Sequence, residues 1–273
     1  MKQVVPLEKA LNESMFGSKA VGLGQALRDG LSVPPGIALC GAIVDAVASG
    51  EARAINEVLK WARPLGGPLA VRSSAADEDG ASASFAGQHL TLLNVPSCEE
   101  LVVALREVWW SANSDSAITY RKKVGLFTRP SIGVVVQGLL DPSAAGVMFT
   151  RNPVTGADER VIEASWGLGE AVVAGLVIPD SFRIDRSGRV LERRAGFKQI
   201  AIRTIPAGGT FKEDVAEELV EQFCLDEEAI RELSRLADRC EQVYGPARDI
   251  EWALAGGKLY LLQCRAITGM APK

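Results

Sequence analysis

The sequence predicts an α+β protein built on antiparallel or mixed sheets. Helical and strand periodicities both occur along its 273 residues, but they do not alternate as the βαβ units of a doubly wound sheet do. Instead, strand candidates follow one another in the second half with turn residues between them, which is typical of an antiparallel or mixed sheet. These candidates are 131–140, 144–152, 160–166 and 180–186.

Helices and further strands are predicted around that sheet. Ser97 is placed to cap a helix with two glutamates in its first turn, and Asp226 is a second expected N-cap. Gly30 is expected to end the first helix. The expected helices are 18–30, 41–62 (as one or two), 97–120 and 212–244, and the further strands are 69–74 and 89–95.

Composition and charge narrow the class of protein. Hydrophobic residues make up 47% and charged residues 23%, as in ordinary soluble globular proteins. A net charge of −4 disfavours nucleic acid and anionic membranes as partners. No apolar run reaches the roughly 18 residues of a membrane span, and the five cysteines form no CxxC pair. We therefore expect a cytoplasmic protein with reduced thiols.

Two stretches of the first half suit phosphate binding. In GSKAVGLG (17–24), glycines allow close backbone approach and Lys19 offers a positive charge, although a surface lysine at a Gly-rich helix start fits equally. In VRSSAADEDGASASFAGQ (71–88), Arg72 leaves an apolar strand and enters a Ser- and Gly-rich loop. A guanidinium beside exposed amides is a phosphate cradle. The alternative is an ordered loop with a salt-bridged arginine.

Two stretches of the second half carry weaker signals. GVMFTRNPVTG (146–156) places Arg151 at the end of a strand before a turn, either as a catalytic residue or in a structural ion pair. EASWGLGEAVVAGLVIPDSF (163–182) combines a Gly-x-Gly turn with Glu170, which either lines a pocket or caps the following turn.

The segment DIEWALAGGKLYLLQCRAIT (249–268) predicts a β-hairpin whose register can be derived. A three-residue loop, Gly-Gly-Lys, puts the four polar residues of the two strands on one face and leaves the other face apolar. In that register Glu251 faces Gln263, and Asp249 faces Arg265. The polar face is either a solvated surface with a weak Asp–Arg pair or a Mg²⁺–phosphate site.

Taken in chain order, these motifs are similar to those of a known family. The chain resembles the ATP-binding, ATP-grasp-type N-terminal domain of phosphoenolpyruvate synthase, pyruvate phosphate dikinase and rifampicin phosphotransferase. The matching motifs are VRSS…SFAGQ…LNV, GVMFT…PVTG, GLGE-VVAG-PD and DIEWA…LYLLQ-RAIT. The resemblance implies a two-lobed ATP-grasp-type nucleotide-binding module with mixed or antiparallel sheets, an N-terminal lobe at 1–130 and a C-terminal lobe at 131–273, which bind Mg-ATP in the cleft between them.

The resemblance also implies roles for individual residues. The expected catalytic residues are Lys19, Arg72, Arg151 and Arg265, and the expected Mg²⁺ ligands are Glu251 and Gln263. The expected ATP contacts are Lys19, Arg72, Gly87, Thr91, Gln137, Glu170, Asp249, Glu251, Gln263 and Arg265.

The chain departs from the family in what it lacks. These enzymes pass phosphate through a histidine on a swivelling domain, and His89, the single histidine here, matches no such carrier motif. No acceptor-binding domain is recognisable. In addition, Ser18 and Ala20 make the first motif less Gly-rich, and the stretch between Lys19 and Arg72 is short. We therefore expect a His-bearing partner domain or chain and a separate acceptor-binding domain.

The resemblance implies a dikinase-type phosphotransferase subunit or domain. Attack on the β-phosphorus of Mg-ATP by the partner's histidine would give AMP and inorganic phosphate, and the β-phosphoryl group would pass to the acceptor. The alternatives are a non-catalytic ATP-binding module that regulates a partner protein and a self-contained ATP-grasp ligase that releases ADP.

Overall fold

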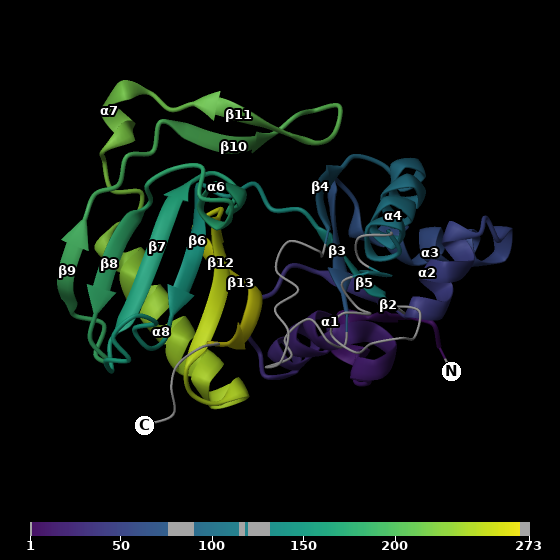
Figure 1. The fold of residues 1–273 in the computed structure, drawn as a ribbon, viewed down its shortest axis with the longest axis horizontal. Coiled ribbons are helices and arrows are strands. Elements are labelled where there is room, and N and C mark those ends of the chain that lie inside the picture. The colour runs from purple at the N-terminus through teal and green to yellow at the C-terminus, as the bar shows by residue number, and fades with distance from the viewer. Residues whose placement is uncertain (1, 76–89, 115–117, 120–131, 268–273) are drawn as a thin grey trace. The chain divides into compact units, whose positions relative to one another are not determined.

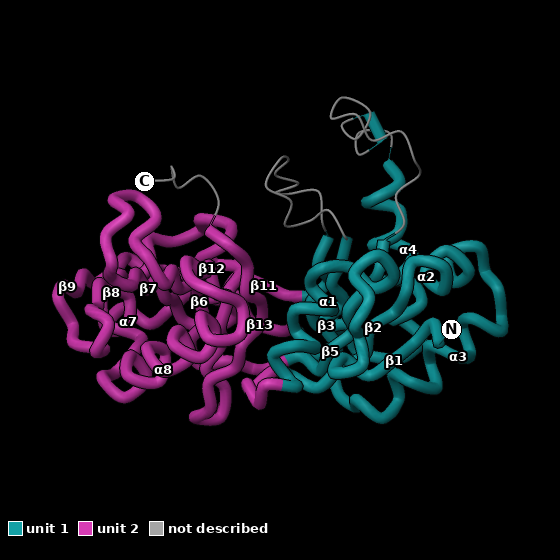
Figure 2. Tube along the Cα trace, turned by 90° about the horizontal axis from the view of Figure 1, so that it is seen from below, with its two compact units in different colours: residues 1–28, 34–139, 205–209 teal, residues 29–33, 140–204, 210–273 magenta. Residues whose placement is uncertain are grey.

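The computed structural model describes residues 2–75, 90–114, 118–119 and 132–267. The chain divides into two compact units, which Figure 2 distinguishes by colour. Unit 1 comprises Met1–Arg28, Pro34–Leu139 and Ile205–Gly209, and unit 2 comprises Asp29–Val33, Leu140–Thr204 and Thr210–Lys273. The boundary expected at residue 130 lies outside the described residues and stays a prediction.

Unit 1 is built on a five-stranded sheet whose described pairings are all antiparallel, in the order β1-β2-β5-β3-β4. Its strands are β1 (Val4–Pro6), β2 (Gly36–Leu39), β3 (Leu69–Ser74), β4 (Thr91–Val95) and β5 (Gly133–Gly138). Its helices are α1 (Glu13–Arg28), α2 (Gly41–Ala48), α3 (Ala52–Ala62) and α4 (Cys98–Ala112), with two 3-10 turns, η1 (Leu7–Lys9) and η2 (Arg63–Leu65). Strands β1 and β2 were not predicted, and 41–62 forms two helices.

Local signals explain where α4 begins and ends. The Ser97 hydroxyl accepts hydrogen bonds from two backbone N–H groups of the first turn, which confirms the predicted N-cap. The helix ends at Ala112 and a turn follows at 113–114, so the predicted helix over 97–120 is interrupted; residues 118 and 119 are helical again, and 115–117 and 120 lie outside the described residues. Asn113 stops it by donating its side-chain amide back to the carbonyl of Trp109 at 2.9 Å, a local bond that competes with helix continuation.

Unit 2 is built on a six-stranded antiparallel sheet in the order β13-β12-β6-β7-β8-β9, with a two-stranded ribbon, β10-β11. Its strands are β6 (Ala144–Phe149), β7 (Arg160–Trp166), β8 (Asp180–Ile184), β9 (Val190–Arg194), β10 (Ile200–Thr204), β11 (Thr210–Asp214), β12 (Arg248–Ala255) and β13 (Lys258–Ala266). Its helices are α6 (Glu170–Val173), α7 (Glu217–Val220) and α8 (Glu227–Tyr244). The predicted α+β class is confirmed.

The core of unit 2 lies between the large sheet and α8, which runs along one face of the sheet (Figure 1). Ile250, Met148 and Ile162 are aligned on adjacent strands and are all fully buried. Arg160, on the same face of β7 as Ile162, donates to the carbonyl of Ser234 on α8 at 2.8 Å. Side chains alternate along a strand, so this apolar face fixes which residues lie on the opposite face.

The prediction of one helix over 212–244 was wrong in its first part. Residues 210–214 form β11, which pairs with β10 around a turn at 205–209. The predicted helix began at residue 212, just beyond the Pro206-Ala-Gly-Gly turn, whose following residues pair back onto β10. From Asp226 onward the prediction is confirmed, since its carboxylate accepts from the N–H of Ala229 at the start of α8.

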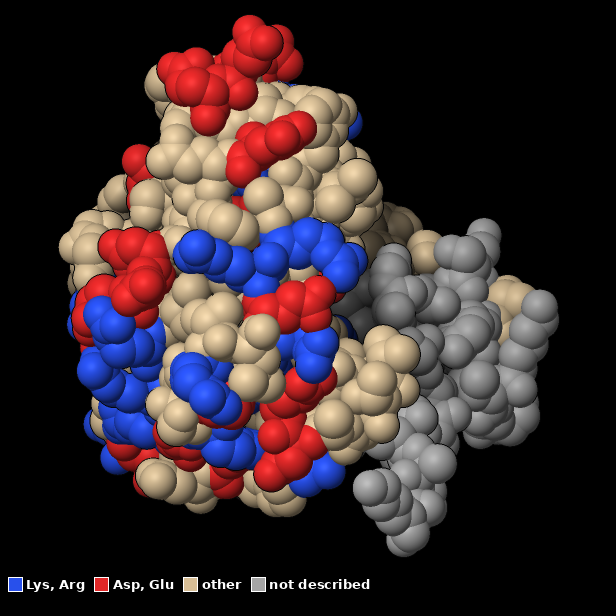
Figure 3. All heavy atoms as spheres, turned by 90° about the vertical axis from the view of Figure 1, so that its left-hand side faces the viewer, with Lys and Arg blue, Asp and Glu red and all other residues tan. Residues whose placement is uncertain are grey.

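Strand β9, also not predicted, forms an edge of the large sheet. Lys or Arg and Asp or Glu side chains are interspersed over that side of the molecule (Figure 3). Glu192 of β9 pairs with Arg194 and, across the strands, with Arg183. Charges of this kind discourage edge-to-edge pairing with another sheet.

In the part of the chain that the structure describes, no helix is long and apolar enough to span a bilayer.

Candidate functional site

In unit 1, the start of α1 is fastened to the end of β3. The helix breaks at Gly17, whose φ is +81°. Beyond the break, the N–H of Ala20 donates to the Ser74 hydroxyl at 3.0 Å, and the Lys19 ammonium donates to the Ser73 carbonyl at 2.9 Å. The two phosphate-type motifs predicted from sequence are therefore in direct contact, with Lys19 largely buried.

The other candidates of unit 1 share one face of its sheet. Arg72 lies opposite Thr91 on β4 and opposite Val135 on β5, and Gln137 is two residues beyond Val135. Residues that face each other, or lie two apart on a strand, project on the same side, so Arg72, Thr91 and Gln137 do so. The Gln137 amide donates to the carbonyl of Pro34 at 3.0 Å.

In unit 2, the hairpin β12–β13 brings its four polar residues together as predicted. Asp249 lies opposite Arg265, and Glu251 lies opposite Gln263. All four are on the face of the sheet opposite α8, because Ile250 between them points into the core. The Asp249 carboxylate accepts a hydrogen bond from Arg265 Nε at 2.8 Å.

The loop of this hairpin was predicted wrongly. Ala255 lies opposite Lys258, so the loop has two residues, Gly256 and Gly257, both with positive φ. A Gly-Gly pair in this conformation is a type I′ turn, whose twist matches the flanking strands. A β-bulge then adds one residue, Leu262, between the pairs Trp252–Leu261 and Glu251–Gln263. The bulge restores the polar face that a two-residue loop alone would have mixed.

Glu163 on β7 is a residue of the same face that sequence reasoning missed. It lies opposite Val147 on β6, which in turn lies opposite Glu251. Glu163, Glu251 and Gln263 therefore form one row across four strands. The row follows from the β6–β7 and β6–β12 pairings, which join segments far apart in the sequence, and no short-range signal contains it.

Glu170 lies in the first turn of α6 and is half-buried. Burial raises the pKa of its carboxyl group above the ordinary value of 4.5, and a hydrogen bond from the Thr210 hydroxyl at 3.4 Å opposes this shift. Glu170 is the first residue of α6, and its role as a pocket residue or as a turn cap stays a prediction.

Arg151 is engaged by its own loop. Its guanidinium donates to the carbonyl of Gly156 at 3.1 Å and lies 3.5 Å from the carboxylate of Asp158. These contacts match the structural alternative of the sequence analysis, and the catalytic role stays a prediction. Gly87, expected to contact ATP, and His89 lie outside the described residues.

The chemistry of the hairpin face suits a hard cation. A Glu251 carboxylate and a Gln263 carbonyl are oxygen donors of the kind that Mg²⁺ prefers. Among the described residues, no three His, Cys, Asp or Glu side chains gather as a metal site. Mg²⁺ bound to a nucleotide needs fewer protein ligands, because the phosphates and waters supply the others. The residues present therefore fit Mg²⁺ held together with ATP.

Comparison with known families gives the identity of this module. Residues 42–273 match the family described as pyruvate phosphate dikinase, AMP/ATP-binding domain. The chain belongs to this family. The dikinase ATP-binding domain thus includes β12–β13 and every candidate residue except Lys19, and the predicted resemblance is confirmed.

Individual relatives are similar over much of this domain. A probable phosphoenolpyruvate synthase of Methanothermobacter thermautotrophicus is 43% identical over 202 residues, 73% of this chain and 29% of the relative. A rifampicin phosphotransferase of Streptomyces is 40% identical over 206 residues, which are 74% of this chain and 24% of the relative. The prodigiosin synthesizing transferase PigC of Serratia marcescens is 36% identical over 294 residues, which cover 97% of this chain and 33% of the relative. The chain thus spans a third or less of these relatives.

Solved structures similar to this domain include a D-alanine–D-alanine ligase of Bacillus anthracis complexed with ATP, at 12% identity over 97% of this chain and 59% of the ligase, with a TM-score of 0.41. A truncated Cdc123 of Schizosaccharomyces pombe is 10% identical over 95% of this chain and 85% of its own, with a TM-score of 0.46. Because both TM-scores are below 0.5, the family assignment rests on the sequence match.

Proposed function

We propose that this chain is the ATP-binding part of a dikinase-type phosphotransferase. In this reaction ATP, water and an acceptor hydroxyl give AMP, inorganic phosphate and a phosphorylated acceptor, through a phosphohistidine on a separate domain or chain. The carrying observation is the polar face of β12–β13 in a member of the dikinase ATP-binding family, where two carboxylates, an amide and a guanidinium lie in adjacent cross-strand pairs.

Three residues of that face have a role in the proposed reaction. Glu251 and Gln263 would hold Mg²⁺, which neutralises phosphate charge when bound. Arg265 would contact the transferring phosphoryl group, since a guanidinium binds phosphate oxygens in a fixed geometry. Little covalent chemistry falls to the protein in such a transfer, so its contribution is to position the phosphates and stabilise their charge.

Unit 1 supplies the second set of cations in the proposal. Lys19 and Arg72 lie at the junction of α1 and β3, and a buried lysine there needs an anion or a hydrogen-bonding partner. In the structure the Lys19 ammonium donates to a backbone carbonyl. A bound phosphate oxygen would replace this carbonyl as the acceptor, or would accept a second hydrogen bond from the same ammonium. We propose that Lys19 and Arg72 contact ATP phosphates. Thr91 and Gln137, which project from the same face of the unit 1 sheet as Arg72, would also contact ATP.

The test combines this chain with a polypeptide that carries a phosphohistidine domain of this family, Mg²⁺ and [β-³²P]ATP. AMP should accumulate and acid-labile label should appear on the partner. Lys19→Ala and Arg265→Ala should abolish both signals while circular dichroism shows a folded chain. AMP formation undiminished in both variants contradicts the site assignment. If ATP binds but no partner is ever labelled, the non-catalytic regulatory module is the better description.

A further inference from the structure

The two members of the Asp249–Arg265 pair are held very differently. Asp249 lies on β12, which has a neighbouring strand on each side, and its side chain is 11% exposed. Arg265 lies near the end of β13, the edge strand of the sheet, and its side chain is 48% exposed. The carboxylate is therefore the fixed partner, and the long arginine side chain is the one that needs to be held.

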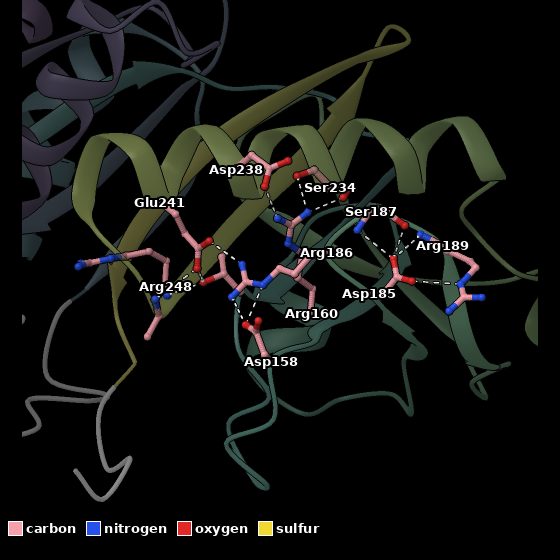
Figure 4. A network of polar contacts seen from close by, with 12 residues as sticks. Asp158, Arg160, Asp185, Arg186, Ser187, Arg189, Ser234, Asp238, Glu241 and Arg248 are labelled. Carbon is pink, nitrogen blue, oxygen red and sulfur yellow. Dashed lines mark hydrogen bonds and ion pairs between the residues drawn. The ribbon is translucent and has the colours of Figure 1, made fainter. Parts of the chain in front are cut away.

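The backbone of Arg248, next to Asp249, is fixed at both its N–H and its carbonyl group by Thr150. The N–H of Arg248 donates to the Thr150 hydroxyl at 2.8 Å, and the Thr150 N–H donates to the Arg248 carbonyl at 2.8 Å. That hydroxyl donates onward to Glu241 of α8 at 2.6 Å, and the other oxygen of Glu241 accepts from Arg186 (Figure 4). A non-glycine residue with positive φ, Ala247, begins this segment, and strained backbone of this kind persists only where its surroundings fix it.

We propose that Asp249 is a positioning residue for Arg265 and not a direct ligand of Mg²⁺ or ATP. The hydrogen bond to Nε fixes the plane of the guanidinium before the nucleotide arrives. An unrestrained arginine on an edge strand would lose its rotational freedom only on binding phosphate, which weakens binding. A carboxylate facing phosphate directly would repel it, whereas one that holds a guanidinium does not. This inference rests on the proposed function.

A double-mutant cycle on Mg-ATP binding measures this role without any histidine-bearing partner. Affinity is measured by isothermal titration calorimetry for the wild type, Asp249→Ala, Arg265→Ala and the double variant. Freeing one long side chain should weaken binding about two- to twelvefold in Asp249→Ala. Losing the charged hydrogen bonds of Arg265 should weaken it about ten- to a hundredfold. If Asp249 acts through Arg265, the double variant binds like Arg265→Ala alone.

A second readout does not depend on nucleotide. The Nε–H signal of Arg265, assigned by its loss in Arg265→Lys, should be resolved in ¹H–¹⁵N spectra of the wild type and collapse to the position of solvent-exposed arginines in Asp249→Ala. A purely packing role for Asp249 would leave this signal in place. Because Arg265 is half exposed and can be solvated, Asp249→Ala should remain folded. Asp249→Asn is the milder second variant.

The chain offers a matched control in the same unit. Arg203 Nε donates to the carboxylate of Glu213 at 3.1 Å, between β10 and β11, with side chains 32% and 49% exposed. Glu213→Gln removes the same kind of pair away from the hairpin, and Mg-ATP affinity should be unchanged.

The outcomes separate the inference from the proposed function. The inference is overturned if the effects of Asp249→Ala and Arg265→Ala multiply in the double variant, or if Asp249→Ala selectively weakens Mn²⁺ binding in the presence of ATP, as loss of a metal ligand would. It is also overturned if the Arg265 Nε–H signal is unaltered in Asp249→Ala. If the wild type fails to bind Mg-ATP, the proposed function is overturned, whatever the Arg265 signal shows.

Discussion

Replacing Gly17 by alanine perturbs the contact that places Lys19 against β3. A Cβ atom at this position would lie 2.0 Å from the Ser74 carbonyl oxygen and 2.3 Å from the Ser74 hydroxyl. Both are far inside any real contact distance, and the nearer atom is backbone, which cannot swing away as a side chain can. The φ of +81° adds a second conflict, because residues with a Cβ rarely adopt it.

The size of the effect follows from these two terms. Holding a non-glycine residue at φ +81° and ψ 163°, a region adopted almost only by glycine, costs about 1–3 kcal/mol, and forcing extra volume into a packed position costs roughly 1–3 kcal/mol. Gly17→Ala should therefore lower the unfolding free energy by roughly 2–6 kcal/mol, a large fraction of the about 5–15 kcal/mol typical of a domain. If the chain escapes the clash by moving α1, Lys19 moves too, and Mg-ATP affinity falls instead.

Gly22→Ala is the matched control, since both glycines lie in α1. Among the described residues, no atom lies within 4 Å of a Cβ at Gly22, so alanine there should stabilise the helix by about 0.5–1 kcal/mol. Urea unfolding followed by circular dichroism and calorimetric titration with Mg-ATP measure both variants. A Gly17→Ala protein with the midpoint of Gly22→Ala and wild-type affinity would refute the reasoning about this turn.

Three further changes test other parts of the fold. Asp180 forms a fully buried ion pair with Lys198 at 2.6 Å; Asp180→Asn leaves a buried charge unpaired and should cost about 3–5 kcal/mol in urea unfolding. Burial raises the Glu170 pKa above 4.5, so the contribution of Glu170 to stability is greatest below that pH and falls as pH rises through the folded pKa. The stability of Glu170→Gln relative to wild type should therefore improve from pH 4 to 8. A difference in stability that does not change with pH would contradict the pKa shift. Deleting Leu262 removes the bulge and should leave a folded hairpin, whereas deleting Lys258 turns buried Leu261 to the polar face and should destabilise it.

Sequence reasoning succeeded where the signal is local. Ser97 and Asp226 cap their helices through bonds to residues two or three positions away, and Gly30 lies just past the end of α1. It failed at 212–214, which belong to β11 and pair with β10, because the apolar residues from 215 onward keep a helical spacing. Strands β1 and β2 were missed because three or four residues carry too little pattern to show a period.

The hairpin register was right for a reason that was partly wrong. An odd loop was chosen because a regular two-residue loop would oppose Glu251 to an apolar residue. The protein uses the two-residue loop that Gly-Gly favours and inserts Leu262 five residues after Gly257, so the parity is restored before Gln263. Both solutions pair Glu251 with Gln263, but they differ for the residues in between. The alternation of polar and apolar residues therefore determines which residues share a face far from the loop, but it does not determine the length of the loop.

The same register decides which oxygen donors can share a cation. Glu251 and Gln263 are direct cross-strand partners, whose Cβ atoms lie about 4.5–5.5 Å apart in such pairs, so both side chains can reach one ion. Glu163 shares their face and row, but Val147 stands between it and Glu251. Two strand spacings of about 4.8 Å separate the two glutamates, which is too far for short ligand bonds to one ion without bending both side chains inward. The geometry therefore favours an amide, Gln263, over a second carboxylate as the partner of Glu251. A site with one carboxylate carries less negative charge, and that suits a cation that arrives already bound to phosphate.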